Sequence, residues 1–321
     1  MKEIGGYLGL DNFVSNEYHH DLISLNTGAN ALLYLIKAKK IKKLYIPYYL
    51  CNSISDMLKK NKFDFDYYNI SDEFYPIFDK EIDKDEYLYI VNYYGQLSDE
   101  KILFIKNKYN RIILDNTHAF FQKPIDGIDT IYSCRKFFGV PDGAYLSTNA
   151  ILEEKLEEDK SSNRMKHILG RFEGQASEYY EEFRMNDETL KDLPLKKMSK
   201  LTKNILGAID YCRVLETRNR NFKYLHDKLR ATNVLNLMIP EGAFAYPYYV
   251  EDGIQVRKKL IDKKIYIPLL WPNVLKENDE ISIEYNFAAN ILPLPCDQRY
   301  TIEDMSYLIE EVKNCLTKKT Y

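Results

Sequence analysis

The first half of the chain alternates short apolar runs with segments of helical periodicity, and this alternation restricts the fold more than any other feature of the sequence. Each run is short, rich in β-branched or aromatic residues and bounded by turn residues, so it predicts a buried strand. Strands that alternate with helices are joined by crossovers and form a parallel sheet with helices on its faces. The predicted fold class is therefore α/β with a mostly parallel sheet.

The expected elements can be placed by residue number. In the first half, helices are expected over residues 30–40 and 51–60, and strands over 43–46, 63–68, 87–93, 111–114, 130–133 and 143–148. The second half is charged and helix-forming, with one or two long helices over 198–229, strands over 244–250 and 265–270, and helices over 254–261 and 302–315. We expect a large domain over residues 1–200 and a smaller C-terminal α+β domain over 201–321.

Charge and hydropathy argue against two classes of partner. The chain has 45 Lys and Arg against 48 Asp and Glu, and both signs are interspersed, whereas nucleic-acid-binding proteins carry a basic excess or stripe. No run approaches the roughly 20 apolar residues that cross a bilayer, and residues 1–6 lack the apolar run of a secretory signal. We therefore expect no nucleic acid, no membrane and a cytoplasmic protein.

The cysteines indicate neither a disulfide framework nor a metal site. Five are present, an odd number, and no two form a CxxC pair. Both kinds of site require tighter grouping. The sequence therefore predicts free thiols in a reducing compartment and no bound metal.

A candidate anion-binding site precedes the first expected helix. The residues are Asn26, Thr27, Gly28 and Ala29, which together offer free backbone N–H groups at a helix start, a hydroxyl and a glycine that permits close approach. An ordinary helix cap by Thr27 is the alternative interpretation of the same residues.

A carboxylate and an imidazole follow the strand expected over residues 111–114. Asp115 stands at the carboxyl end of that strand, which is where ligands of open α/β sheets bind. It is placed to meet a cationic group of a ligand, or it caps the following turn. His118 comes three residues later, beside two phenylalanines, and either contacts the ligand or is a packed, hydrogen-bonded histidine.

A lysine follows the next expected strand. Lys136 is flanked by Phe137 and Phe138, and a lysine amine that loses hydration beside aromatic rings becomes a usable nucleophile or Schiff-base partner. The alternative is an ordinary surface lysine. Ser133, three residues earlier, offers a hydroxyl to the anion-binding site or simply ends the strand.

Taken together, these features serve one chemistry. Pyridoxal 5'-phosphate (PLP) requires a phosphate-binding site, an acidic residue at a strand end and a lysine after the next strand. The phosphate would bind at the helix start, Lys136 would form an imine with the cofactor, and Asp115 would keep the pyridine nitrogen protonated.

The order of these residues resembles the DegT/DnrJ/EryC1/StrS family of fold-type-I PLP-dependent aminotransferases. The resemblance rests on Asn26-Thr27-Gly28, Asp115-Asn116-Thr117-His118-Ala119, Ser133-Cys134-Arg135-Lys136, Gly139, Asp142-Gly143 and Leu292-Pro293-Leu294-Pro295. It implies fold type I, PLP as cofactor, a homodimer, and amination of nucleotide-linked keto-sugars for surface polysaccharides or similar products.

By position, the resemblance also implies residue roles. Lys136 would be the lysine that bonds the cofactor and moves protons, Asp115 the pyridinium partner, and His118 the residue near the phenolic oxygen. The residues expected to hold the phosphate are Thr27, Gly28, Ala29 and Ser133. Either Tyr49 or Cys51 is expected to lie over the cofactor ring.

Two further expectations concern the substrate and the dimer. The family's Asn-x-Arg element is not recognisable, and residues 182–186 are the closest stretch. The acceptor's phosphates are expected to meet one or more of Arg184, Arg218, Arg220 and Arg299. The helical stretch over residues 181–201 is expected to reach across the homodimer.

The predicted function is a PLP-dependent aminotransferase that moves an amino group from an amino acid such as glutamate to a nucleotide-linked keto-sugar in surface polysaccharide biosynthesis. Alternatives are a PLP enzyme acting on another small carbonyl compound and a non-catalytic protein of the same fold. A third is a glycosyltransferase that uses Asp64 and Asp66 as a metal motif, although two carboxylates on one face of an edge strand favour a solvated role.

Overall fold

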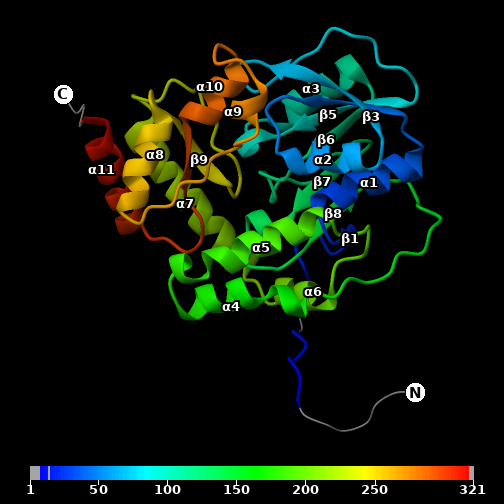
Figure 1. Ribbon diagram of the computed structural model, residues 1–321, viewed down its shortest axis with the longest axis horizontal. Helices are drawn as coiled ribbons and strands as arrows, with labels where there is room; N and C mark the ends of the chain where they lie inside the picture. Colours follow the sequence, from blue (N-terminus) through cyan, green and yellow to red (C-terminus); the bar gives the residue numbers. More distant parts are fainter. Residues whose placement is uncertain (1–7, 14, 318–321) are drawn as a thin grey trace.

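An eight-stranded sheet forms the centre of the computed structural model, which describes residues 8–13 and 15–317 (Figure 1). The strand order is β1-β8-β7-β6-β5-β2-β3-β4. Five neighbouring strands, from β7 to β3, are parallel, whereas β8 is antiparallel to both β7 and β1, and β4 is antiparallel to β3. The strands are β1 (Ile23–Leu25), β2 (Lys43–Pro47), β3 (Asp64–Ile70), β4 (Pro76–Ile77), β5 (Glu86–Val91), β6 (Ile112–Asp115), β7 (Asp129–Ser133) and β8 (Ala144–Ser147).

Helices join the parallel strands. They are α1 (Gly28–Lys39), α2 (Asn52–Lys60) and α3 (Asp99–Tyr109). Local sequence sets their ends: the Thr27 hydroxyl accepts from the N–H of Asn30 at 3.1 Å, and Ser98 starts α3 in the same way. All four residues of β6 are buried, as expected of a strand covered on both faces. The predicted α/β class with a mostly parallel sheet is confirmed.

The topology brings distant segments to one edge of the sheet. The carboxyl ends of β1, β2, β5, β6 and β7 all lie there, and so does the start of the oppositely directed β8. Gly143, just before β8, donates its N–H to the Asn26 carbonyl at 2.7 Å. Its φ is +119°, and any Cβ at this position would lie only 3.2 Å from the Cys134 sulfur, so the turn requires glycine.

The C-terminal part forms a second, smaller layer, on the left in Figure 1. Its antiparallel strands β9 (Ala245–Tyr249) and β10 (Ile291–Pro295) share a core with helices α7, α8 and α11. These helices span Tyr211–Leu229, Gly253–Asp262 and Ile302–Thr317. The segment with α9 (Val274–Glu277) and α10 (Ile283–Asn290) returns to the core of the large sheet through Trp271 and Phe287. The division at residue 200 stays a prediction.

Three further helices lie below the sheet in Figure 1: α4 (Lys166–Glu173), α5 (Tyr180–Lys191) and α6 (Lys200–Leu206). Short 3-10 turns occupy Tyr93–Gly95, Cys134–Lys136, Ser162–Arg164 and Ala176–Tyr179. Within residues 8–13 and 15–317, no helix combines the length and apolar character needed to cross a membrane.

Two predicted elements are wrong. Residues 265–270 form no strand, and Pro268, which has no N–H, lies in the middle of that segment. The helix expected over residues 181–201 ends at Lys191, because Pro194 disfavours helical geometry in the residue before it and cannot donate within a helix. A new helix, α6, then begins at Lys200.

Candidate active site

Asp115 is a buried carboxylate at the end of β6. Its Oδ2 accepts from the Tyr89 hydroxyl at 2.7 Å, and its Oδ1 accepts from the N–H of Thr117 at 2.8 Å. Burial raises the pKa of Asp115, although Thr117, Tyr89 and the charge of Lys136 act in the opposite direction. The carboxylate charge is therefore incompletely compensated, and a cationic group beyond the strand end would stabilise it.

His118 is a buried, neutral imidazole with an unsatisfied nitrogen. Its ring is stacked on Phe244, with centroids 4.2 Å apart and planes 7° from parallel, and Trp271 lies nearly parallel at 5.9 Å. The Nδ1 atom has no hydrogen-bond partner among the residues that the structure describes. Burial, helped by the charge of Lys136, lowers the pKa of His118 to about 3. The ring is therefore uncharged at neutral pH.

Lys136 is exposed at the end of the short turn that follows β7. Within the described ranges, its amine forms no hydrogen bond and no ion pair. Two cavities, of about 540 and 630 Å³, meet at this residue. Lys136 therefore has a free amine that faces solvent-filled space, while its charge acts on both Asp115 and His118.

The start of α1 lies at the same sheet edge. Thr27 caps the helix, as the simpler interpretation of this motif predicted, and Thr27, Gly28 and Ala29 are half-buried. A Cβ on Gly28 would meet nothing closer than an Ile131 methyl group at 4.0 Å, so the space above the helix start is open. Ser133 is half-buried at the end of β7, with no hydrogen bond from its hydroxyl to any described residue.

The two residues expected over a cofactor ring differ in position. Tyr49 is fully buried, with its ring edge-on to Trp271 at 5.1 Å and its hydroxyl 3.5 Å from that of Tyr94. Cys51 is half-buried at the start of α2. Which of the two faces a ligand ring stays a prediction.

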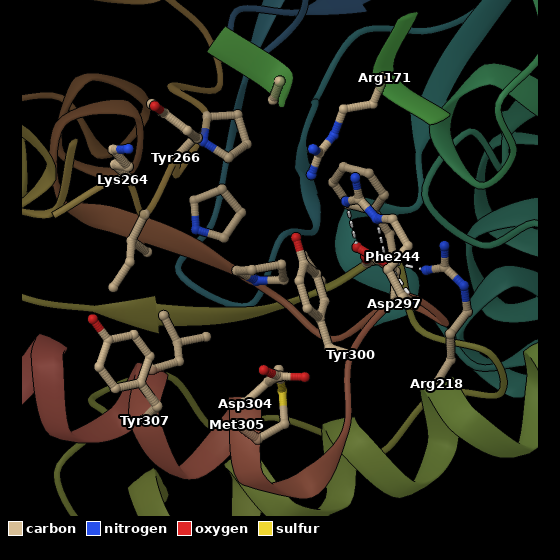
Figure 2. Close-up of a pocket in the computed structure, with 18 of the residues that line it drawn as sticks. Arg171, Arg218, Phe244, Lys264, Tyr266, Asp297, Tyr300, Asp304, Met305 and Tyr307 are labelled. Carbon is tan, nitrogen blue, oxygen red and sulfur yellow. Dashed lines mark hydrogen bonds and ion pairs between the residues drawn. The ribbon is translucent and has the colours of Figure 1, made fainter. Parts of the chain in front are cut away.

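The cavity of about 540 Å³ is lined mainly by the smaller layer, together with Lys136 and residues between Arg171 and Ser177 (Figure 2). Arg171, from α4, reaches into it from one side, and Lys264 and Tyr266, after α8, lie on the opposite side. Arg171 makes only a long hydrogen bond of 3.4 Å to the Gly174 carbonyl, and the amine of Lys264 pairs with no side chain within residues 8–13 and 15–317. These two cations are free to meet an anion.

Of the four arginines expected to bind the acceptor, two line the cavity and all four already have partners. Arg218 is buried and donates to the carbonyl of Ala243 at 2.8 Å and to Gln298 at 2.9 Å. Arg299 is paired with both oxygens of Asp297, at 2.7 and 2.8 Å. The remaining two, Arg184 and Arg220, pair with Glu181 and Asn221 and line neither cavity.

The sequence alone did not single out Arg171 or Lys264. Their local sequence does not differ from that of the other basic residues. What distinguishes these two residues is that no described side chain pairs with their charge. That property depends on contacts between segments far apart in sequence.

The carboxylates of the glycosyltransferase alternative lie on one face of β3. Lys43 contacts both of them, at 3.8 Å from Asp64 and 2.9 Å from Asp66. The Lys43 amine therefore occupies the position in which a metal ion would bind the two carboxylates. In the part of the chain that the structure describes, no three metal-ligating side chains gather into a group.

No protein-family model and no curated protein matches the sequence, but solved structures share its fold. An aminotransferase of the DegT/DnrJ/EryC1/StrS group from Brucella abortus is 12% identical, with a TM-score of 0.60 over 92% of this chain and 86% of its own. NtdA from Bacillus subtilis, with its cofactor PMP bound, is 16% identical, with a TM-score of 0.62 over 92% and 73%. A sugar aminotransferase from Micromonospora echinospora is 13% identical, with a TM-score of 0.57 over 91% and 87%.

These similarities extend over nearly the whole chain, and it is the TM-scores of 0.57 to 0.62, not the low sequence identities, that show a shared fold. The chain therefore has the fold of the DegT/DnrJ/EryC1/StrS aminotransferases, as the order of its residues predicted.

Proposed function

We propose that the chain is a PLP-dependent aminotransferase. The observation that carries this proposal is the meeting, at one sheet edge, of a free lysine amine, a buried carboxylate and an uncharged imidazole with an unsatisfied nitrogen. These are Lys136, Asp115 and His118. The fold is shared with solved sugar aminotransferases, and one from Streptococcus pneumoniae, 14% identical to this chain, was solved in its PMP form.

The side chains fit the cofactor in both chemistry and shape. Asp115 supplies the uncompensated charge that a protonated pyridine nitrogen would meet, and Nδ1 of His118 lacks a partner that a phenolic oxygen would provide. Phe244 covers a face of His118, so a cofactor would meet the edge of the imidazole that carries Nδ1. The open space over Gly28 and the free hydroxyl of Ser133 suit the phosphate.

When bound, PLP supplies an electron-withdrawing ring that stabilises negative charge at the α-carbon of an amino acid. Nζ of Lys136 would be the base that takes the proton from this α-carbon and delivers it to the carbon of the cofactor that receives the amino group. Asp115 is held in one orientation by Tyr89 and Thr117, so its charge stays directed at the ligand. His118 orients the ligand by a hydrogen bond without adding charge, because burial keeps its pKa near 3.

We extend this proposal to the substrates. Glutamate or a similar amino acid is the donor, and a nucleotide-linked keto-sugar is the acceptor. The cavity beside Lys136 supports this choice, since Arg171 and Lys264 offer cations to phosphates, and Tyr266 and Tyr300 offer ring faces to a sugar or base. This function belongs to surface polysaccharide biosynthesis in the cytoplasm.

The proposal is tested by following the two half-reactions in the absorption spectrum. Protein reconstituted with PLP is expected to lose its visible band when glutamate is added, and to regain it with a nucleotide-linked keto-sugar. Absence of any change with a panel of amino acids would remove the aminotransferase. Recovery with a small phosphorylated ketone, and with no nucleotide-sugar, would remove only the sugar acceptor.

We also propose that the protein is a homodimer whose interface includes α4 and α5. Large apolar side chains are exposed on this pair of helices: Leu169, Phe172, Tyr180, Phe183 and Met185. Clusters of this kind mark interaction surfaces. The first of the two helices also carries Arg171 into the cavity, so a second copy docked there would border the substrate site.

Light scattering at micromolar concentration is expected to give twice the mass of the chain. Phe172 is 91% exposed, and Phe172→Asp is expected to give a monomer because a charge would be buried in the interface. Phe104, 64% exposed on α3, supplies the matched control, and Phe104→Asp should remain dimeric. A parent protein that is monomeric and fully active would contradict the dimer.

A further inference from the structure

Tyr300 lies in the turn between β10 and α11 and lines the cavity of about 540 Å³ together with Lys136. Its side chain is half-buried, and Figure 2 shows its hydroxyl pointing into the cavity, toward the side from which Arg171 enters. Among residues 8–13 and 15–317, this hydroxyl has no hydrogen-bond partner. Tyr300 therefore offers an unused donor and acceptor to a ligand beside Lys136.

The turn that carries Tyr300 is held by buried polar groups. Asn221, fully buried on α7, donates to the carbonyl of Asp297 at 3.3 Å and to that of Tyr300 at 2.9 Å. Within the turn, the N–H of Tyr300 donates to the Asp297 carbonyl at 3.2 Å, and Arg299 pairs with both oxygens of the Asp297 side chain. These contacts fix the backbone at Tyr300, so its ring moves only by rotation about the side-chain bonds.

A second set of contacts holds this turn against the segment of Lys136. Gln298 donates to the carbonyl of Phe137, the residue that follows Lys136, at 2.8 Å. Arg218, buried on α7, donates to Gln298 at 2.9 Å and to the same Phe137 carbonyl at 3.3 Å. The Tyr300 hydroxyl and the Lys136 amine therefore face one cavity from a connected framework, which keeps their relative positions constant.

The chemistry of this hydroxyl suits a neutral, hydroxyl-bearing ligand. Burial raises the pKa of Tyr300, although the charge of Arg299 acts in the opposite direction, so the phenol is uncharged at neutral pH. In a nucleotide-linked acceptor the carbonyl belongs to the sugar, so the sugar must lie at the Lys136 end of the cavity. The phosphates lie farther along, where the cations of Arg171 and Lys264 serve them.

We propose that the hydroxyl of Tyr300 binds a hydroxyl group of the acceptor's sugar ring and thereby selects hydroxylated acceptors over simple ketones. The inference rests on the proposed aminotransferase function. A site that pairs with a substrate hydroxyl rejects an analogue that lacks it, because the protein group then loses water without gaining a partner. The guanidinium of Arg299 lies over the Tyr300 ring, 5.2 Å from its centroid, which leaves the hydroxyl and the opposite face to the sugar.

The first test measures binding without turnover. The probes are dTDP-glucose and UDP-glucose, which carry a sugar but no keto group, with dTDP and UDP as references, each titrated calorimetrically into the PLP-loaded protein. The sugar is expected to improve the affinity of at least one nucleotide. Tyr300→Phe removes one oxygen and keeps the ring. It is expected to raise the Kd of that nucleotide-sugar about fivefold to tenfold and to leave the Kd of the nucleoside diphosphate within about twofold of the parent value.

Tyr307→Phe is the matched control. Tyr307, on α11, lines the same cavity and is 53% exposed, but Figure 2 shows its hydroxyl pointing away from Tyr300. This variant should bind every probe as the parent does. Parent-like binding of the nucleotide-sugar by Tyr300→Phe, an equal loss with the nucleoside diphosphate, or no gain from the sugar in the parent would overturn the sugar contact. Failure of all the probes to bind would remove the nucleotide-linked acceptor and this contact with it.

The second test separates this inference from the function on which it rests. In Tyr300→Phe, loss of the visible band with glutamate is expected to keep the parent rate, whereas recovery with a nucleotide-linked keto-sugar should have a kcat/KM about tenfold lower. Parent-like recovery overturns the sugar contact and leaves the aminotransferase intact. Nucleotide-sugar binding that depends on Tyr300, in a protein that transaminates no amino acid, overturns the proposed function and keeps the contact.

Discussion

Replacement of Lys136 by alanine is expected to abolish amino-group transfer and leave the fold unchanged. The lysine is exposed and has no hydrogen bond or ion pair within the described ranges, so truncation should alter the free energy of unfolding by no more than about 0.5 kcal/mol. The reaction loses both its nucleophile and its base, and turnover should fall by at least about 10³-fold. Stopped assays with glutamate, together with a thermal melt, measure the two effects.

The same residue can be identified chemically. Borohydride treatment of the parent protein is expected to fix the cofactor covalently on Nζ of Lys136, and peptide mapping locates the label. Lys200, with a side chain 85% exposed, provides a control: Lys200→Ala should keep both label and activity. A label on another lysine would show that the assignment of Lys136 is wrong.

The sequence predicted the parts of the site that local patterns determine. Short apolar runs identified β5, β6 and β7, and the end of a parallel strand is visible in the sequence itself, so Asp115 and Lys136 could be placed at one sheet edge before the structure was known. The helix start was equally local, since a hydroxyl and a glycine precede an apolar helix; it was expected at residue 30, and α1 begins at Gly28.

The remaining features depend on contacts between distant segments. Arg218 was expected to bind a ligand, but the carbonyl of Ala243 and the side chain of Gln298 occupy its guanidinium. Arg257 could not be singled out in the sequence, because the lack of a partner for its Nε and Nη1 among the described residues becomes evident only when its neighbours in the fold are known. The stacking of Phe244 on His118 joins residues of the two layers, and no periodicity in either segment indicates it.

Asp115→Asn is expected to lower turnover by at least about 10²-fold and to leave the cofactor-free protein no less stable than the parent. The two effects have one cause. Because burial raises the pKa of Asp115 in the folded protein, the unfolded chain releases this proton at lower pH, and stability falls as the pH rises from the unfolded value to the folded one. At neutral pH the buried charge therefore opposes folding, and the uncharged amide of asparagine removes that cost.

With PLP bound, the parent is expected to be more stable than Asp115→Asn. A protonated pyridine nitrogen compensates the carboxylate of the parent but gains nothing from an amide, so PLP should raise the Tm of the parent more than that of Asp115→Asn. Asp129, at the start of β7, is a matched control, since it is also 7% exposed but pairs with Lys39, away from the site. Asp129→Asn should lose stability and keep turnover. If Asp115→Asn keeps turnover within a few-fold of the parent, or gains as much from PLP, then the carboxylate does not face the pyridine nitrogen and the proposed cofactor orientation is wrong.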